Sequence, residues 1–111
     1  MFAEMVKLKV RPGFTREEAL DDARSTIARW SANRDLVRKH YLFGEDGCLY
    51  GLYLWKSREA ALKGHDAEWQ AHVTERVGAR PEFAYFDVMM ILDNEKGSVD
   101  EYPSPEPQEQ A

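Results

Sequence analysis

The stretch LVRKHYLFGEDGCLYGLYLW, residues 36–55, decides the fold of this chain. Two runs rich in leucine, aromatic and β-branched residues, 36–43 and 48–55, flank the tetrapeptide Gly44-Glu45-Asp46-Gly47. An Asp-Gly pair between two such runs is a strong hairpin signal, because a tight turn that matches strand twist needs residues that tolerate a positive φ. The sequence therefore predicts two antiparallel strands in the middle of the chain.

The segment before this hairpin predicts a strand and a helix. In residues 2–10 valine and leucine alternate with lysine, the period of two that is typical of a half-buried strand. Thr15 and Glu18 then form a capping-box pattern, in which the two side chains bond free N–H groups of a first helical turn. We expect the helix to reach about Trp30.

The segment after the hairpin predicts a second helical region and a last strand. Helical spacing runs from Ser57 through Val77, with an expected bend at Gly64, and residues 83–92 form the last strand. The element order is thus β-α-β-β-α-β. It predicts an α+β, ferredoxin-like fold with one antiparallel sheet and both helical regions on one face.

The length of 111 residues allows a single domain, which we expect to span residues 1–94. Residues 95–111 hold five carboxylates against one lysine, together with three prolines, so the acidity of the chain lies in this tail. With Val99 and Tyr102 as its main apolar residues, the tail buries too little surface to offset the entropy of ordering it, and we expect disorder. The alternative is a strand or arm swapped onto a partner through these two residues.

Composition excludes several classes of function. The formal net charge of −5 gives no long-range attraction for phosphate, so neither nucleic acid nor an anionic membrane is an expected partner. No apolar run approaches the roughly 20 residues of a membrane span. Residues 1–7 lack a signal-peptide pattern and Cys48 is the single cysteine, so a reducing cytoplasm is the expected location.

Both faces of the predicted sheet are apolar, although alternation should leave one of them polar. Burying a second face of about 320 Å² in each of two copies would yield roughly 16 kcal/mol gross, against an association cost of about 4 to 15 kcal/mol. We therefore expect a homodimer; the alternative is that residues 95–111 cover this face within one chain. Sorted by face, the strand residues are Val37, Tyr41 and Phe43 against Leu36, His40 and Leu42; Leu49, Tyr53 and Trp55 against Tyr50, Leu52 and Leu54; and Phe86, Val88, Met90 and Leu92 against Phe83, Tyr85, Met89 and Ile91.

Two segments carry a resemblance to a known family. Residues 52–61, Leu-Tyr-Leu-Trp-Lys-Ser-Arg-Glu-Ala-Ala, and residues 85–88, Tyr-Phe-Asp-Val, resemble the YdhR-like monooxygenases of the dimeric α/β-barrel superfamily. The resemblance covers roughly residues 36–94. It implies the ferredoxin-like fold, a dimer, and similarity to small enzymes that oxygenate phenolic or quinol substrates with O₂ and without metal or flavin. The chain departs from the pattern where residues 86–88 run on into Met89 and Leu92 and where the second helical region is slightly longer.

Three aromatic and imidazole side chains are candidates for catalysis. His65, Trp69 and His72 stand at i, i+4 and i+7, so they share one face if the stretch is helical throughout. One imidazole would act as a general base toward a phenolic or enolic proton, and Trp69 would pack on the substrate ring and donate its N–H to the developing oxyanion. The alternative is that the two histidines are partly exposed helix residues and that Trp69 belongs to the core.

Five further residues are candidates for binding the substrate: Tyr41, Tyr53, Trp55, His40 and Asp87. The three rings could form the mouth of a pocket for a planar ligand, or an ordinary aromatic core. His40 could face the pocket or the dimer interior. Asp87 needs a basic partner, either to orient a histidine or to form an interface salt bridge.

These features lead to a hypothesis of a monooxygenase that needs no cofactor and acts on a small hydrophobic or aromatic molecule in a pocket between helices and sheet. No metal site is expected, because His65 and His72 lack the i, i+4 spacing of a helical zinc pair. The alternative is a non-catalytic small-molecule-binding or stress-response protein of the same fold. A third possibility is an isomerase, a lyase or a haem-degrading protein on this scaffold.

Overall fold

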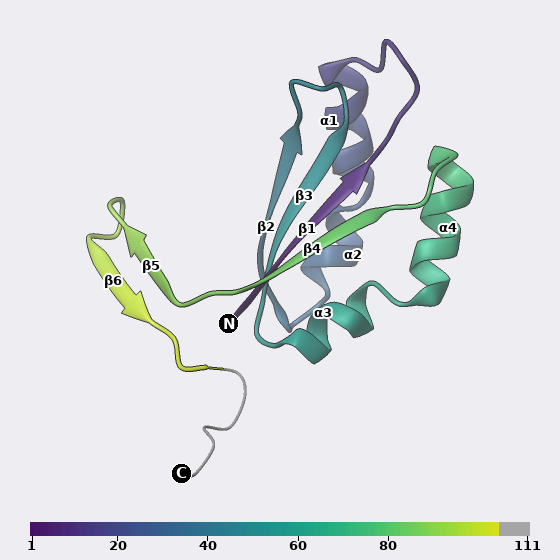
Figure 1. The fold of residues 1–111 in the computed structure, drawn as a ribbon. Helices are drawn as coiled ribbons and strands as arrows, with labels where there is room; N and C mark the ends of the chain where they lie inside the picture. Colours follow the sequence, from purple (N-terminus) through teal and green to yellow (C-terminus); the bar gives the residue numbers. More distant parts are fainter. Residues whose placement is uncertain (105–111) are drawn as a thin grey trace.

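A computed structural model describes residues 1–104 of the chain (Figure 1). Its centre is a four-stranded sheet in the order β2-β3-β1-β4, in which every neighbouring pair is antiparallel. The first and third strands in sequence are therefore the central ones, as a ferredoxin-like fold requires, and the predicted fold class is confirmed. The strands are β1 (Phe2–Leu8), β2 (Leu36–Phe43), β3 (Leu49–Trp55) and β4 (Glu82–Asp87).

Four helices cover one face of this sheet (Figure 1): α1 (Arg16–Ser25), α2 (Ile27–Ser31), α3 (Arg58–Gly64) and α4 (Ala67–Val77). The capping box at Thr15 is confirmed. The Thr15 hydroxyl accepts a hydrogen bond from the Glu18 backbone N–H, and the Glu18 carboxylate accepts one from the Thr15 backbone N–H. Each predicted helical region is divided in two. In the second region α3 ends at Gly64 and Asp66 caps a new helix by accepting from the Trp69 backbone N–H. Among residues 1–104 no helix is long and apolar enough to cross a membrane.

The β2–β3 hairpin forms as predicted. Gly47 adopts a φ of +81°, which only glycine accepts without strain, and Asp46 accepts hydrogen bonds from the Cys48 N–H and the Tyr50 hydroxyl. One expected side-chain direction is wrong: a register shift between Leu36 and Arg38 places Leu36 opposite Trp55, on the helix-facing side of the sheet. Strict alternation from the sequence could not show this, because a bulge inserts one residue into the count.

The last strand is shorter than predicted. β4 ends at Asp87, and after Val88 and Met89 the chain forms a separate hairpin of β5 (Met90–Asp93) and β6 (Ser98–Glu101), which projects from the body of the molecule (Figure 1). The expectation that residues 83–92 form one continuous strand is thus wrong.

The expected boundary at residue 94 falls inside the turn of this projecting hairpin, so the prediction of a disordered tail is wrong for residues 95–104. The turn is stabilised locally, because the Asp93 carboxylate accepts from the N–H groups of Glu95 and Lys96, and Gly97 takes a φ of +68°. Val99 pairs with Leu92 of the same chain. Residues 105–111 of the predicted tail lie outside the described residues.

The core lies between the sheet and the helices and is unusually aromatic. Trp30 of α2 and Trp69 of α4 pack toward Tyr53 and Trp55 of β3. Two polar residues, Glu4 and His65, are buried in this apolar layer. A buried charged or polar group is costly unless it is bonded, and this pair is the starting point for the site.

Candidate functional site

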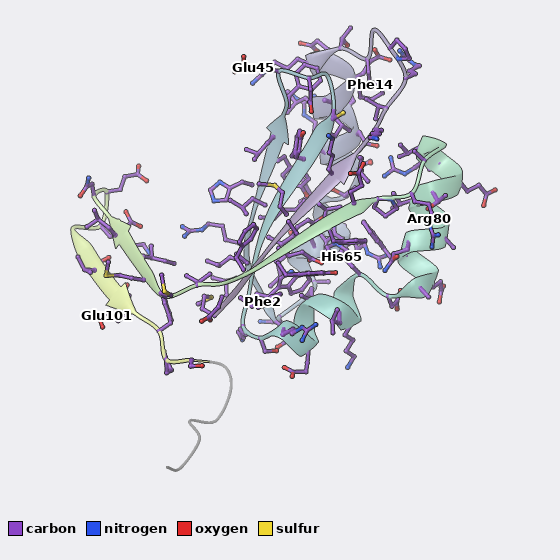
Figure 2. The ribbon with its side chains drawn as sticks, viewed as in Figure 1. Phe2, Phe14, Glu45, His65, Arg80 and Glu101 are labelled. Carbon is purple, nitrogen blue, oxygen red and sulfur yellow. The ribbon has the colours of Figure 1, made fainter. Side chains whose placement is uncertain are left out.

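Glu4 and His65 form a buried hydrogen-bonded pair at the centre of the core. The Glu4 side chain is 0% exposed and that of His65 only 1%. His65 Nδ1 lies 2.7 Å from Glu4 Oε1, and the indole N–H of Trp55 donates to the same oxygen at 2.9 Å. Figure 2 shows His65 between the sheet and helices α3 and α4. The carboxylate thus fixes the orientation of the imidazole, as in carboxylate–histidine pairs that act on protons.

The local sequence explains how the two groups meet. Glu4 stands between Phe2 and Val6 in the alternation of β1, so its side chain enters the helix-facing side of the sheet. His65 follows the last residue of α3 with φ −113° and ψ 56°, outside helical geometry, and this break aims its ring at the sheet. The sequence analysis did not identify Glu4, although a carboxylate at an inward position of an alternating strand is a readable signal.

The imidazole of His65 is enclosed by aromatic rings. The ring centroids of Trp69 and Tyr53 lie 4.1 Å and 4.5 Å from that of His65, and Trp30 follows at 5.0 Å. Burial among these rings lowers the pKa of His65 below its usual value, outweighing the opposing effect of Glu4. The imidazole is therefore neutral near pH 7, with Nδ1–H donating to Glu4 and Nε2 left as an acceptor.

Two atoms of this pair have no hydrogen-bond partner: His65 Nε2 and Glu4 Oε2 are the buried side-chain atoms without one among the described residues. Leaving a buried acceptor unsatisfied costs about 1 to 3 kcal/mol. Such exceptions are rare in native proteins, and one accepted explanation is a catalytic role. A neutral imidazole with a free Nε2, held by a carboxylate, can accept a proton.

A cavity of about 140 Å³ lies beside the pair, between α1 and the sheet, with Trp69 of α4 in its wall. Tyr53 and Trp69 line this cavity and also contact the imidazole of His65, so they separate the two. Tyr41 is a further aromatic wall. No hydrogen bond joins the indole N–H of Trp69 to an acceptor in the described part of the chain, so it is available to a ligand.

Lys39 is a second residue that the sequence analysis missed. It lines the cavity, and its Nζ lies 3.9 Å from the ring centroid of Tyr41 and 4.6 Å from that of Tyr53. Burial lowers the pKa of Lys39 to about 7. As with Glu4, the sequence shows a charged residue at an inward-facing position of a strand, which could have identified Lys39 as a candidate. Lys39 lies directly opposite Tyr53.

The structure brings together only part of the predicted catalytic set. His65 and Trp69 are in contact, but His72 is exposed on α4. The stretch is not helical throughout, because the helix is interrupted between Gly64 and Ala67, and within α4 the buried face holds Trp69 and Val73 while His72 is exposed. The expectation that all three share one helix face is therefore wrong.

Of the five predicted substrate-binding residues, two line the cavity and three lie elsewhere. Tyr41 and Tyr53 line the cavity. Trp55 is fully buried and bonds Glu4, so it supports the pair from the core. His40, opposite Leu52, is exposed on the other face of the sheet, and Asp87 is exposed at the end of β4 with no ion pair to any of residues 1–104.

A metal site and a reactive cysteine are the alternatives to this pair in the described part of the chain. Residues 1–104 contain no group of three or more histidine, cysteine, aspartate or glutamate side chains that could hold a metal ion. Cys48 is a free, half-buried thiol beside the β2–β3 turn. The proton-accepting pair and the neighbouring cavity are therefore the strongest candidate site.

Comparisons with known proteins identify the fold. No family model and no curated protein matches the chain. A monooxygenase of Streptomyces coelicolor, from the gene ActVA-Orf6 and solved with nanaomycin D, is similar over 77% of this chain and 84% of its own, with 18% identity and a TM-score of 0.60. SnoaB of Streptomyces nogalater, a cofactor-independent oxygenase, is similar over 82% of this chain and 95% of its own, with 16% identity and a TM-score of 0.60. At this identity the likeness establishes the ferredoxin-like fold that antibiotic biosynthesis monooxygenases share.

Proposed function

We propose that the chain is a cofactor-independent monooxygenase that oxidises a small aromatic or quinol-type molecule in the cavity between α1 and the sheet, as a member of the YdhR-like branch of its superfamily. One observation carries the proposal: a neutral imidazole, oriented by a buried carboxylate and with a free Nε2, lies directly behind the aromatic wall of a cavity. The similarity in fold to a cofactor-independent oxygenase supports it.

The first step of the proposed reaction is proton removal. A substrate ring that rests on Tyr53 and Trp69 places its acidic C–H or O–H next to the wall that covers His65. Because the imidazole is buried, the Trp69 ring must shift when substrate binds for Nε2 to reach this proton. Glu4 then stabilises the imidazolium that forms, and the Trp69 N–H donates to the oxygen on which negative charge develops.

The second step is the reaction with O₂. For a substrate with an acidic CH₂ group between rings, the carbanion gives one electron to O₂, and the radical pair combines to form a C–O bond. Protonation gives a hydroperoxide, which loses water and leaves a C=O group. The carbon loses four electrons and O₂ gains four, so one oxygen atom enters the product and the other leaves as water. The aromatic walls exclude water from these intermediates.

The test of this function is oxygen uptake. With anthrone, 1,4-naphthohydroquinone and 1-naphthol as a panel, we expect the protein to accelerate O₂ consumption for at least one member, with one substrate oxidised per O₂ consumed. An oxygen electrode and chromatography of the products measure both quantities, and heat-denatured protein is the control. Absence of uptake with all three compounds, while the protein is folded, would contradict the proposal.

A second candidate function is non-catalytic binding of a hydrophobic metabolite in the same cavity. The burial of His65 behind Tyr53 and Trp69 favours it, since an imidazole that stays enclosed cannot exchange protons with a ligand. The two functions differ in one observable. Quenching of tryptophan fluorescence by the panel compounds without oxygen uptake indicates the binding protein.

We also propose that two copies pair through the sheet face that the helices leave open. Leu42, Leu52, Leu54 and Phe86 point to this face, where Phe86 is 53% exposed and Leu42 is 41% exposed. Four further apolar side chains, in or next to the β5–β6 hairpin, are exposed: Met89, Met90, Leu92 and Val99. A contiguous exposed apolar face is typical of a surface that binds another protein.

The substitution Phe86→Glu should convert the dimer to a monomer, because it places one charge from each copy in the buried face. Sedimentation velocity measures the change. The control is Leu62→Glu, at a residue that is 48% exposed on α3 in the helix layer, which should leave the dimer intact. A wild-type protein that sediments as a monomer at micromolar concentration would contradict the proposed pairing.

A further inference from the structure

We propose that Lys39 is the anion-recognition residue of the cavity, and that the ligand carries an acidic oxygen on its ring system that binds in ionised form on Lys39 Nζ, apart from the C–H group that His65 deprotonates in the proposed reaction. The inference rests on the proposed function only in taking the cavity as the ligand site, and it holds equally for the binding protein. It names the chemical class of the ligand, which neither the fold nor the pair of Glu4 and His65 specifies.

Lys39 enters the cavity from the sheet. It lies on β2 opposite Tyr53 of β3, and its side chain is half-buried and lines the cavity wall. Its Nζ lies 3.9 Å from the ring centroid of Tyr41, 4.6 Å from that of Tyr53 and 5.4 Å from that of Trp30. The ammonium group is therefore held among aromatic faces rather than in water.

No carboxylate of residues 1–104 forms a direct ion pair with this ammonium group. Lys39 makes no ion pair and donates no hydrogen bond to any acceptor in residues 1–104. Asp22 also lines the cavity and its charge favours the charged form of Lys39, but Asp22 is ion-paired with Arg76, whose positive charge acts in the opposite direction. Glu4 is already bonded to Trp55 and His65. A partly desolvated cation without a counter-ion is costly, and an anion in the cavity would supply the missing partner.

The ionisation of Lys39 agrees with this role. Burial has lowered its pKa to about 7, so the group is about half charged at neutral pH. A bound anion favours the charged form and raises the pKa again, while a neutral ligand does not. By linkage, an anionic ligand binds best below pH 7 and loses its advantage as pH rises above 7 and Lys39 becomes neutral.

The walls limit the kind of anion. Tyr41, Tyr53 and Trp69 offer aromatic surface next to the amine of Lys39, which suits an acidic oxygen on a flat ring, and Arg16 of α1 is a second cation in the lining. A bare phosphate group would leave the three aromatic rings without a partner, so the walls favour an anion that is part of a ring system. The cavity of about 140 Å³ is smaller than the roughly 300 Å³ at which pockets for drug-sized ligands begin. We therefore expect a small ligand.

The experiment compares two naphthoquinones that differ in one ionisable hydrogen. 2-Hydroxy-1,4-naphthoquinone is an anion at neutral pH, and its 2-methoxy ether is neutral with the same rings. We expect the full-length wild-type protein to bind the anion at least about tenfold more tightly at pH 6.5, measured by quenching of tryptophan fluorescence and confirmed by calorimetry. The preference should decrease between pH 7 and pH 9, although the probe stays ionised.

The variant Lys39→Met should bind the two probes about equally, and the matched control Lys56→Met, at an exposed lysine after β3, should keep the wild-type preference. Lys39→Gln is the second variant if the methionine variant does not fold by circular dichroism. Equal binding of both probes by the wild type, or a preference that survives both Lys39 substitutions, overturns the inference. Failure of oxygen uptake with an intact Lys39-dependent preference contradicts the proposed oxygenase and leaves this inference standing.

Discussion

Replacing His65 by asparagine should lower kcat for oxygen uptake by about 100-fold or more, the usual contribution of a general base. The asparagine amide N–H₂ stands near the position of Nδ1 and can still donate to Glu4, so the buried carboxylate keeps a partner. The change removes Nε2, the acceptor that has no partner in the structure. The variant should still bind the naphthoquinone probes, because His65 does not line the cavity.

Two matched variants separate catalysis from folding. His72→Asn makes the same substitution at the exposed histidine of α4 and should leave kcat unchanged. Glu4→Gln keeps the size and one acceptor of the side chain but removes the charge that stabilises the imidazolium. As a single substitution it should lower kcat, but combined with His65→Asn it should cause little further loss of kcat. Full activity in His65→Asn would exclude His65 as the base.

The pH profile gives an independent readout of the same pair. His65 must be neutral to accept a proton, and burial lowers its pKa below the ordinary value of 6.5. The acid limb of kcat/KM should therefore have its midpoint below pH 6.5. A limb above pH 6.5 would indicate another base.

Replacing Gly64 by alanine should destabilise the fold by about 2 kcal/mol, within the usual cost of overpacking a core. A Cβ at this position would overlap Cη2 of Trp55 and approach Cζ2 and Cζ3 to 3.1 Å. Trp55 cannot move away easily, because it is fully buried, is stacked on Tyr53 and bonds Glu4. For a domain of this size the loss corresponds to a Tm lower by about 8 °C, which calorimetry measures.

The control for this substitution is Lys63→Ala, at the exposed preceding residue of α3, which should change the stability by less than about 0.5 kcal/mol. An unchanged Tm in Gly64→Ala would mean that α3 does not pack closely on Trp55. Since His65 follows Gly64 directly, it would also contradict the position of the imidazole. His65→Asn and Gly64→Ala therefore test the same local geometry, the first through activity and the second through stability.

The sequence predicted the framework of this fold because its signals are local. The Asp-Gly turn, the capping box of Thr15 and Glu18, and the period-two alternation of β1 each depend on residues a few positions apart. The errors came where a local pattern was extended too far. Helical spacing was carried across Asp66, which caps a new helix, and strand character was carried across Val88 into a separate hairpin.

The candidate site was predicted only in part, for a related reason. Trp69, Tyr53 and Tyr41 were identified as aromatic candidates and do line the cavity, and His65 was identified as a candidate base. Glu4 and Lys39 were missed, although each is a charged residue at an inward position of an alternating strand. Alternation shows that such a side chain points inward, but it does not show what the side chain meets there.

By itself, the sequence determined the β-α-β-β-α-β order of the four-stranded sheet and its two helical regions, the central hairpin and the presence of apolar surface on both faces of the sheet. Only the tertiary structure decided that Glu4 and His65, 61 positions apart, share a hydrogen bond, that His72 is exposed, and that Lys39 has no direct ion-pair partner among residues 1–104. The physical reason is that secondary structure follows from interactions between neighbours in the chain. The charge and protonation of a buried group instead depend on side chains that distant segments bring within about 4 Å.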